Sequence, residues 1–217
     1  MTKKRHYKNY SGRISEFWNS CGKGFAHISQ GYLKWQDMSQ EHRLAWALKL
    51  AKKYNLTVDK IKQIFNKSVV IDYGTGSGYL GLALQILDIS KYIGIDIANR
   101  QLKVASKTLK DISAEFYLAP VEFSEIKADV FISHACIQHF PDEAYIVSFL
   151  KNLNNSNIQH IFLQYRHSEK PKFVENDPGQ SCSVNSNFIK EHLDYELVSL
   201  SEVGRANYQF SYWRKLG

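Results

Sequence analysis

Cysteine is scarce in this chain of 217 residues, and the three that occur, Cys21, Cys136 and Cys182, have no C-x-x-C spacing. An odd, unpaired set argues against a disulfide framework and a cysteine-rich zinc site, and we predict no metal. The sequence also lacks a run of 18 apolar residues, so no transmembrane helix and no membrane partner are predicted. No apolar segment follows the N-terminal charges as in a signal peptide, and a reducing cytoplasm is the expected location.

The chain has little excess charge apart from its N-terminus. The net charge is +7, and four of these charges come from Lys3, Lys4, Arg5 and Lys8, which leaves +3 for the rest. We interpret this tail as a solvated terminus, with an arm for nucleic acid or another anion as the alternative. The length and an apolar content of 44% predict one domain with a sizeable core.

Three closely spaced glycines mark the stretch at 69–84, which reads VVIDYGTGSGYLGLAL. The stretch begins with an apolar run of the kind that fills a buried parallel strand. Gly74, Gly76 and Gly78 follow at every second position, and the apolar segment at 79–87 is typical of a buried helix. A strand, a glycine turn and a helix N-terminus together predict a site where a ligand lies against the backbone.

The glycine spacing indicates which ligand this is. A dinucleotide-binding fingerprint has the form G-x-G-x-x-G, but Tyr79 stands where its third glycine belongs. Asp72 lies two positions before Gly74, where a carboxylate would repel a phosphate and attract an ammonium group. The pattern D-x-G-x-G-x-G resembles motif I of the class I S-adenosylmethionine (SAM) methyltransferases.

A second acidic residue supports this resemblance. The segment at 92–97 reads YIGIDI and is predicted to be a buried strand ending near Asp96, 20 residues after Gly76. A carboxylate at a strand tip can accept hydrogen bonds from both hydroxyls of a ribose. A helix N-cap is the structural alternative for Asp96, and an NAD-binding domain would use the same carboxylate.

The resemblance covers about residues 65–217 and implies an α/β, Rossmann-like class I methyltransferase fold. This fold has a central seven-stranded, mostly parallel sheet with a C-terminal antiparallel hairpin, and helices on both faces. The further strands are predicted at 114–118, 128–133 and 158–166, and the hairpin at 195–203 and 208–213. A helix opening at 141–143, a polar loop at 167–183 and a helix at 184–193 complete the prediction.

The N-terminal segment 1–66 is predicted to be an aromatic and helical cap on a methyltransferase domain at 67–217, within one structural domain. A helix capped by Asp37 or Ser39 and ending near Tyr54 is predicted, followed by a short helix capped by Thr57.

Residues 1–35 combine aromatic residues with glycines, and an amphipathic helix is predicted to begin near Ile14. This composition fits either a hydrophobic arm packed on the domain or a lid over the active site. Many small-molecule methyltransferases carry such a segment before motif I, often with a Trp followed by a polar residue, as in Trp18-Asn19.

The loop at 134–140 reads HACIQHF and lacks the N/D-P-P-Y/F signature of enzymes that methylate base or amide nitrogens. Cys136 follows alanine rather than the proline expected of a cytosine-methylating nucleophile. Both of these methyltransferase classes are therefore disfavoured. His139 is the general-base candidate, because an imidazole titrates near neutrality, with packing beside Phe140 as the alternative. Metal ligation by His134 and His139 lacks a third ligand.

The ends of two predicted strands carry further candidate site residues. Family members often carry an acidic residue after the third strand to contact adenine, but Ala119-Pro120 stands there. Backbone groups or Glu122 are the alternatives for that contact. Arg166, at the end of a predicted strand, is expected to hold a carboxylate or phosphate of the substrate, with a surface ion pair as the alternative.

The resemblance implies SAM as cofactor, S-adenosyl-L-homocysteine (SAH) as product, and methyl transfer to oxygen or nitrogen of a small polar molecule by in-line displacement. An RNA or protein methyltransferase using the basic tail and a non-catalytic SAM-binding module are the alternatives, with nucleic acid disfavoured. His139 is the expected catalytic residue. The expected substrate contacts are Tyr7, Tyr10, Trp18, Tyr165 and Arg166. The expected cofactor contacts are Asp72, Gly74, Thr75, Gly76, Gly78, Asp96, Ile97, Ala119, Pro120 and His134.

Overall fold

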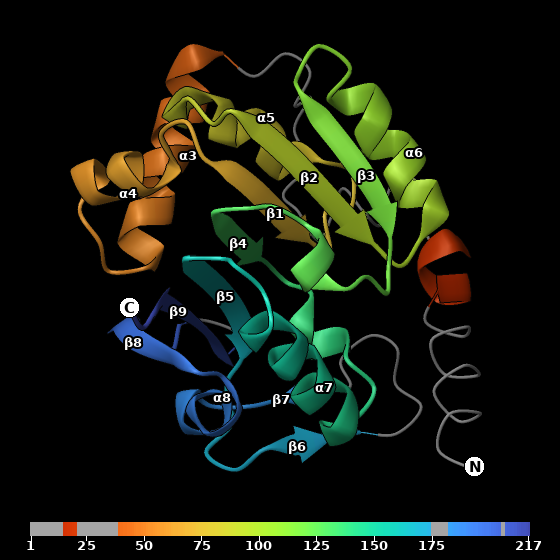
Figure 1. Cartoon of the computed structure of the whole chain (residues 1–217), viewed down its shortest axis with the longest axis vertical. Coiled ribbons are helices and arrows are strands. Elements are labelled where there is room, and N and C mark those ends of the chain that lie inside the picture. The colour runs from red at the N-terminus through yellow and green to blue at the C-terminus, as the bar shows by residue number, and fades with distance from the viewer. Residues whose placement is uncertain (1–14, 21–38, 175–181, 205–206) are drawn as a thin grey trace.

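Seven strands form one sheet in the order β3-β2-β1-β4-β5-β9-β8 in the computed structural model, which describes residues 15–20, 39–174, 182–204 and 207–217 (Figure 1). Strands β1 to β5 are parallel, and β9 runs antiparallel to β5 and β8. The predicted mostly parallel sheet with a C-terminal antiparallel hairpin is confirmed. The strands are β1 (Val69–Tyr73), β2 (Lys91–Asp96), β3 (Ala114–Leu118), β4 (Val130–Ser133), β5 (His160–Arg166), β8 (Tyr195–Leu200) and β9 (Tyr208–Lys215).

Helices cover both faces of this sheet, and Figure 1 shows α3, α4 and α5 apart from α7 and α8. Short 3-10 turns occur at η2 (Gln85–Leu87), η3 (Phe123–Glu125) and η4 (Ile137–His139), and residues 15–20 are also helical. The helices are α3 (Gln40–Lys53), α4 (Val58–Phe65), α5 (Tyr79–Leu84), α6 (Asn99–Thr108), α7 (Glu143–Asn154) and α8 (Ser186–His192).

The inner strands are apolar because both of their faces are buried. Successive side chains of a strand point to opposite faces, and β1 shows the consequence. Val70 packs into the cluster that contains Leu50 of α3, whereas Ile71 packs into the cluster that contains Leu150 of α7. The N-terminal helices α3 and α4 therefore share a hydrophobic core with the sheet.

The helix starts follow the capping residues of the sequence. The side chains of Ser39 and Thr57 accept hydrogen bonds from backbone N–H groups at the starts of α3 and α4, as predicted. Asp142 caps α7, so this helix begins one residue after it. Asp37, the other candidate cap of α3, lies outside the described residues.

Several predicted boundaries were wrong, and the strands predicted at 128–133 and 158–166 begin at Val130 and His160. The polar loop at 167–183 contains a short antiparallel pair, β6 (Lys172–Phe173) and β7 (Cys182–Ser183). The first strand of the hairpin ends at Leu200 rather than at 203, and β9 extends to Lys215. The sequence did not predict this pair, because strands of two residues are too short to show alternation and the segment is polar. Within the described ranges, no helix is both long and apolar enough to cross a membrane.

The strand order reverses between β1 and β4. From β1 the chain moves outward through β2 to β3, and it then returns to place β4 and β5 on the other side of β1. In open α/β sheets, ligands bind at such a switch point, outside the carboxyl ends of the strands. This edge therefore locates the candidate site.

Candidate active site at the carboxyl ends of β1, β2 and β4

The turn after β1 has a backbone that suits glycine at three positions. The φ angles of Gly74, Gly76 and Gly78 are +81°, +53° and +78°, in the left-handed region that favours glycine. The N–H groups of Gly74 and Thr75 donate to the carbonyl oxygen of Ile95 at 2.7 and 3.0 Å, which anchors the turn to the end of β2.

Gly74 also meets a close neighbour. A Cβ atom at Gly74 would lie 2.5 Å from Cβ of Cys136 and 2.6 Å from its Sγ, so no side chain fits there. The loop after β4 therefore packs directly on the glycine turn. This loop has its own left-handed residue, Ala135, with a φ angle of +52°.

Asp96 connects the glycine turn with the start of α6. Its Oδ2 accepts from the N–H of Gly76 at 2.9 Å, and its Oδ1 accepts from the N–H of Ala98 at 2.8 Å. Burial raises the pKa of Asp96, and these backbone donors act in the opposite direction. Each carboxylate oxygen keeps a second lone pair, so Asp96 can still accept hydrogen bonds from two ligand hydroxyls.

Asp72 is 3% exposed beneath the same turn. The hydroxyl of Tyr92 donates to its Oδ2, and the hydroxyls of Tyr92 and Thr75 are 2.6 Å apart. Burial raises the pKa of Asp72 to about 7, against the lowering effect of the hydrogen bonds from Tyr92 and Thr75. A cation bound near Asp72 would favour the ionised carboxylate. Our sequence reasoning missed Tyr92, although a tyrosine inside an apolar strand calls for a hydrogen-bond partner.

The side chain of His134 points toward α3 and β9. Its Nε2 lies 2.7 Å from the hydroxyl of Tyr54, and its ring stacks on the ring of Tyr54 with centroids 5.7 Å apart. Burial lowers the pKa of His134 to about 3, so the ring is neutral at physiological pH. The predicted cofactor contact of His134 is one through its backbone, and it stays a prediction.

Cys136 and His139, both in the loop after β4, have different neighbours: Cys136 lies against Gly74 and His139 against Trp18. Burial raises the pKa of the Cys136 thiol, so the thiol stays protonated at neutral pH and is a poor nucleophile. His139, at the end of η4, meets Trp18 of the helix at 15–20 edge-on, with ring centroids 4.9 Å apart. The structure thus brings together the candidate base and one predicted substrate contact.

Neutral polar side chains make two hydrogen-bonded groups, one between η4 and β9 and the other between β5 and β9. Gln138 is 3% exposed and donates to the hydroxyl of Tyr208 at 3.4 Å. Gln209 accepts from the hydroxyl of Tyr165 at 3.1 Å, and its Oε1 also lies 3.1 Å from Nδ1 of His167. Sequence reasoning missed Gln138, Tyr208 and Gln209, because only the antiparallel pairing of β5 with β9 brings 208–209 next to 165–167.

The other predicted site residues are scattered. Tyr165 is fully buried and donates to Gln209, which disfavours direct contact with a substrate, and Arg166 is half-buried at the end of β5. The carbonyl of Ile97 accepts from the hydroxyl of Ser15 at 3.0 Å. Tyr7 and Tyr10 lie outside the described residues. In the described part of the chain, no group of three His, Cys, Asp or Glu residues could hold a metal ion.

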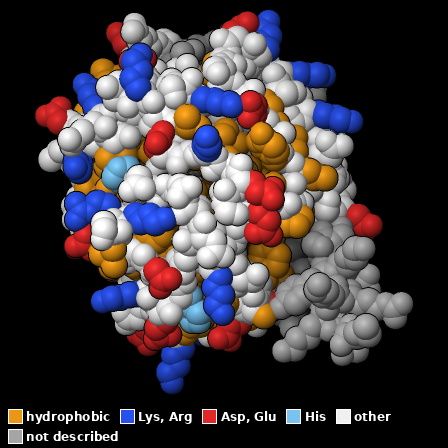
Figure 2. Space-filling view, in the orientation of Figure 1, with side chains coloured by type: hydrophobic (Ala, Val, Ile, Leu, Met, Phe, Trp, Pro, Cys, Tyr) orange, Lys and Arg blue, Asp and Glu red, His pale blue; other side chains and the backbone are white. Residues whose placement is uncertain are grey.

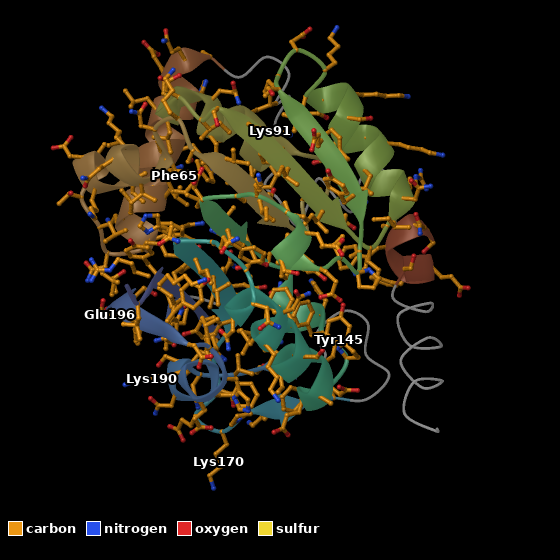
Figure 3. All side chains as sticks on the ribbon, in the orientation of Figure 1. Phe65, Lys91, Tyr145, Lys170, Lys190 and Glu196 are labelled. Atoms are coloured by element: carbon orange, nitrogen blue, oxygen red, sulfur yellow. The ribbon has the colours of Figure 1, made fainter. Side chains whose placement is uncertain are left out.

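Ala119 and Pro120 are joined by a cis peptide bond at the end of β3. The N–H of Ala119 donates to the carbonyl of Asp96 at 2.9 Å, which places Ala119 next to the tip of β2. Pro120 and Glu122 line a separate groove of about 500 Å³ along β2 and β3. Lys91, labelled in Figure 3, also lines that groove and pairs with Glu115 at 2.6 Å.

Comparison with known proteins identifies the class to which this geometry belongs. A family model described as "Methyltransferase domain" matches residues 64–202. No curated protein matches the sequence.

Several solved structures have the same fold. Magnesium protoporphyrin IX methyltransferase from Synechocystis PCC 6803, solved with bound SAM, is 13% identical, with a TM-score of 0.63 and coverage of 95% of this chain and 97% of that chain. A SAM-dependent methyltransferase from Leishmania major is 12% identical, with a TM-score of 0.67 and coverage of 94% and 82%. TehB from Haemophilus influenzae is 17% identical, with a TM-score of 0.56 and coverage of 78% and 67%.

Proposed function

This chain belongs to the methyltransferase domain family and is a SAM-dependent methyltransferase, and we propose that it methylates an oxygen or nitrogen atom of a small polar molecule. Bound SAM would supply a methyl group on a positively charged sulfur; the acceptor atom would bond to the methyl carbon as the carbon–sulfur bond opposite it breaks and SAH leaves. The protein's own contribution is to hold the two molecules in line and to exclude water. Such alignment can account for about 7–11 kcal/mol of the barrier.

We assign the cofactor half of the site to Asp72, the turn at 74–78 and Asp96. The left-handed glycines leave the backbone open to a close ligand, and Asp96 has lone pairs free for the two ribose hydroxyls. The buried carboxylate of Asp72 suits the methionine ammonium group, directly or through water. These groups fit SAM, and the ionised carboxylate of Asp72 would repel the pyrophosphate of a dinucleotide.

We assign the acceptor half to residues in and next to η4, namely Trp18, Gln138, His139 and Tyr208. The observation that carries the proposal is Gln138: its Oε1 is buried and has no hydrogen-bond partner among the described residues. A buried acceptor without a partner costs about 1–3 kcal/mol, and an N–H or O–H group of a bound molecule would remove that cost. This favours a small acceptor with polar hydrogens that fits beside the loop after β4.

In this proposal, His139 takes the proton released when a hydroxyl is methylated. It lies one residue from Gln138, and Trp18 covers it from the helix at 15–20. Imidazole is a suitable base near neutral pH. An amine that is already neutral needs less help, so the importance of His139 depends on the acceptor atom.

The surface charge is consistent with a small acceptor. On the face drawn in Figure 2, basic and acidic side chains of the described residues are interspersed, and no extended field of one sign covers the face. A nucleic-acid substrate usually requires such a positive field.

The experiment is a panel assay for SAH release with small hydroxyl-, amine- and carboxylate-bearing metabolites, run beside total tRNA and a protein extract. We expect turnover with one class of metabolite that persists at 0.5 M salt, where phosphate-driven binding is about 10³-fold or more weaker. His139→Ala should slow turnover about 10²–10⁴-fold if the acceptor is a hydroxyl. Turnover that occurs only with tRNA and disappears at high salt would contradict the proposal.

A further inference from the structure

The first turn of α6 lacks a cap from its own N-terminus. The N-cap position is Ala98, which has no side chain able to accept a hydrogen bond. Helix starts leave N–H groups without partners, and Ser, Thr, Asp or Asn normally accepts from one of them. This uncapped start lies two residues after Asp96, the residue assigned to the ribose.

The missing cap comes from the helix at 15–20. The side chain Oδ1 of Asn19 accepts from the N–H of Arg100 at 3.0 Å, in the first turn of α6. The Nδ2 of Asn19 donates to the carbonyl of Ser15 at 2.8 Å, which orients the amide so that its oxygen faces α6. The guanidinium of Arg100 returns a hydrogen bond to the carbonyl of Asn19 at 3.2 Å. Figure 1 shows this short helix, in red, beside α6.

The same helix also holds the residue between Asp96 and the N-cap. The hydroxyl of Ser15 donates to the carbonyl of Ile97 at 3.0 Å. The turn at 96–100 is therefore held from two directions, by the Asp96 carboxylate on the N–H of Ala98 and by the helix at 15–20 on Ile97 and Arg100. Trp18, on the same helix, reaches His139 on the acceptor side.

We propose that Asn19 is a positioning residue for the cofactor: by capping α6 from outside, it docks the helix at 15–20 as a latch over the turn that holds the ribose. Docking of the latch fixes the carboxylate geometry that the ribose needs. By linkage, cofactor binding must then stabilise the docked latch to the same extent. The inference rests on the cofactor assignment and not on the identity of the acceptor.

The test measures SAH binding by calorimetry and apo stability by thermal melting, with the full chain. Asn19→Ala should weaken SAH binding about tenfold, within the range typical of coupled sites. Asn19→Asp keeps an oxygen acceptor at a helix N-terminus and should restore most of the affinity. In the wild-type chain, SAH should slow hydrogen exchange at residues 15–20 and at the N–H of Arg100.

A double variant distinguishes a role of Asn19 in cofactor binding from a role only in the stability of α6. Asn19→Ala removes the cap of α6 and should lower the melting temperature of the apo chain. Ala98→Ser gives α6 a cap of its own, so the double variant should regain that melting temperature but not the SAH affinity. The latch is overturned if Asn19→Ala leaves SAH affinity unchanged, or if the added serine restores affinity together with stability. If Ala98→Ser prevents folding because Ala98 is buried, two other results decide between the latch and a simple cap: the SAH affinity of Asn19→Asp, and the hydrogen exchange of the wild-type chain with and without SAH. A wrong acceptor class would leave all these binding results intact, so the two failures are distinguishable.

Discussion

The cofactor half and the acceptor half of the site consist of different kinds of chemical groups. In the cofactor half, backbone groups of one turn, the buried carboxylate of Asp72 and the partly buried carboxylate of Asp96 lie within residues 72–98. In the acceptor half, neutral side chains come from η4, from β9 and from the helix at 15–20, which are far apart in the sequence. The comparison shows that a local segment can specify the cofactor, whereas the acceptor surface exists only once distant segments have folded together.

The largest expected effect is on the cofactor half. Asp96→Ala removes a charged acceptor for two hydroxyls, each bond contributing about 1.5–3 kcal/mol, so SAH affinity should fall about 10²–10⁴-fold. The SAH-dependent rise in melting temperature should vanish, as measured by thermal shift. The matched control, Asp111→Ala, removes an exposed carboxylate beyond the end of α6 and should leave the shift unchanged. An unchanged shift in Asp96→Ala would contradict the ribose assignment.

The second prediction concerns pH and is also specific to the cofactor half. The pKa of Asp72 in the folded apo protein is raised to about 7 by burial, so the carboxylate is largely protonated below that pH. SAH affinity should therefore rise with pH, approaching tenfold per pH unit below 7 and levelling off above it.

Apo stability should change in the opposite direction. Between the ordinary carboxylate pKa and about 7, the folded chain holds a proton that the unfolded chain releases, so this group favours folding less as pH rises through that window. Calorimetric titrations from pH 5.5 to 8.5 test the affinity, with Asp72→Asn as the pH-insensitive control. An affinity that is flat across this range in the wild-type chain would count against a role for Asp72.

The smallest expected effect lies in the acceptor half. Gln138→Leu removes a buried acceptor that has no partner among the described residues, together with the long 3.4 Å hydrogen bond to the partly exposed Tyr208, so apo stability should change little. The KM for the methyl acceptor should rise about 3–10-fold through the loss of one hydrogen bond, while SAH affinity stays unchanged. A change in SAH affinity without a change in acceptor KM would remove Gln138 from the acceptor half.

The fold was largely predictable because its signals are local. The apolar run at 69–71, the glycines at 74–78 and the strand ending at Asp96 each occupy a few consecutive residues, and their spacing predicts a strand, a turn and a second strand. The hairpin of β8 and β9 followed from alternation in the same way. The capping roles of Ser39 and Thr57 needed only the first turn of each helix.

The acceptor half was not predictable for a physical reason. Gln138 and Tyr208 are 70 residues apart and become neighbours through the pairing of β9 with β5. Asn19 caps a helix 81 residues away, and the sequence around Ala98 shows only that a cap is absent. The turn of His134 toward Tyr54 likewise depends on where α3 packs on the sheet.

A crystal structure of the chain with SAH bound tests the central claim most directly. We predict both ribose hydroxyls within about 2.6–3.2 Å of the Asp96 carboxylate oxygens, and the amino-acid end against the turn at 74–78 above Asp72. A nucleoside seated elsewhere, with the Asp96 carboxylate contacting only Gly76 and Ala98, would contradict the account.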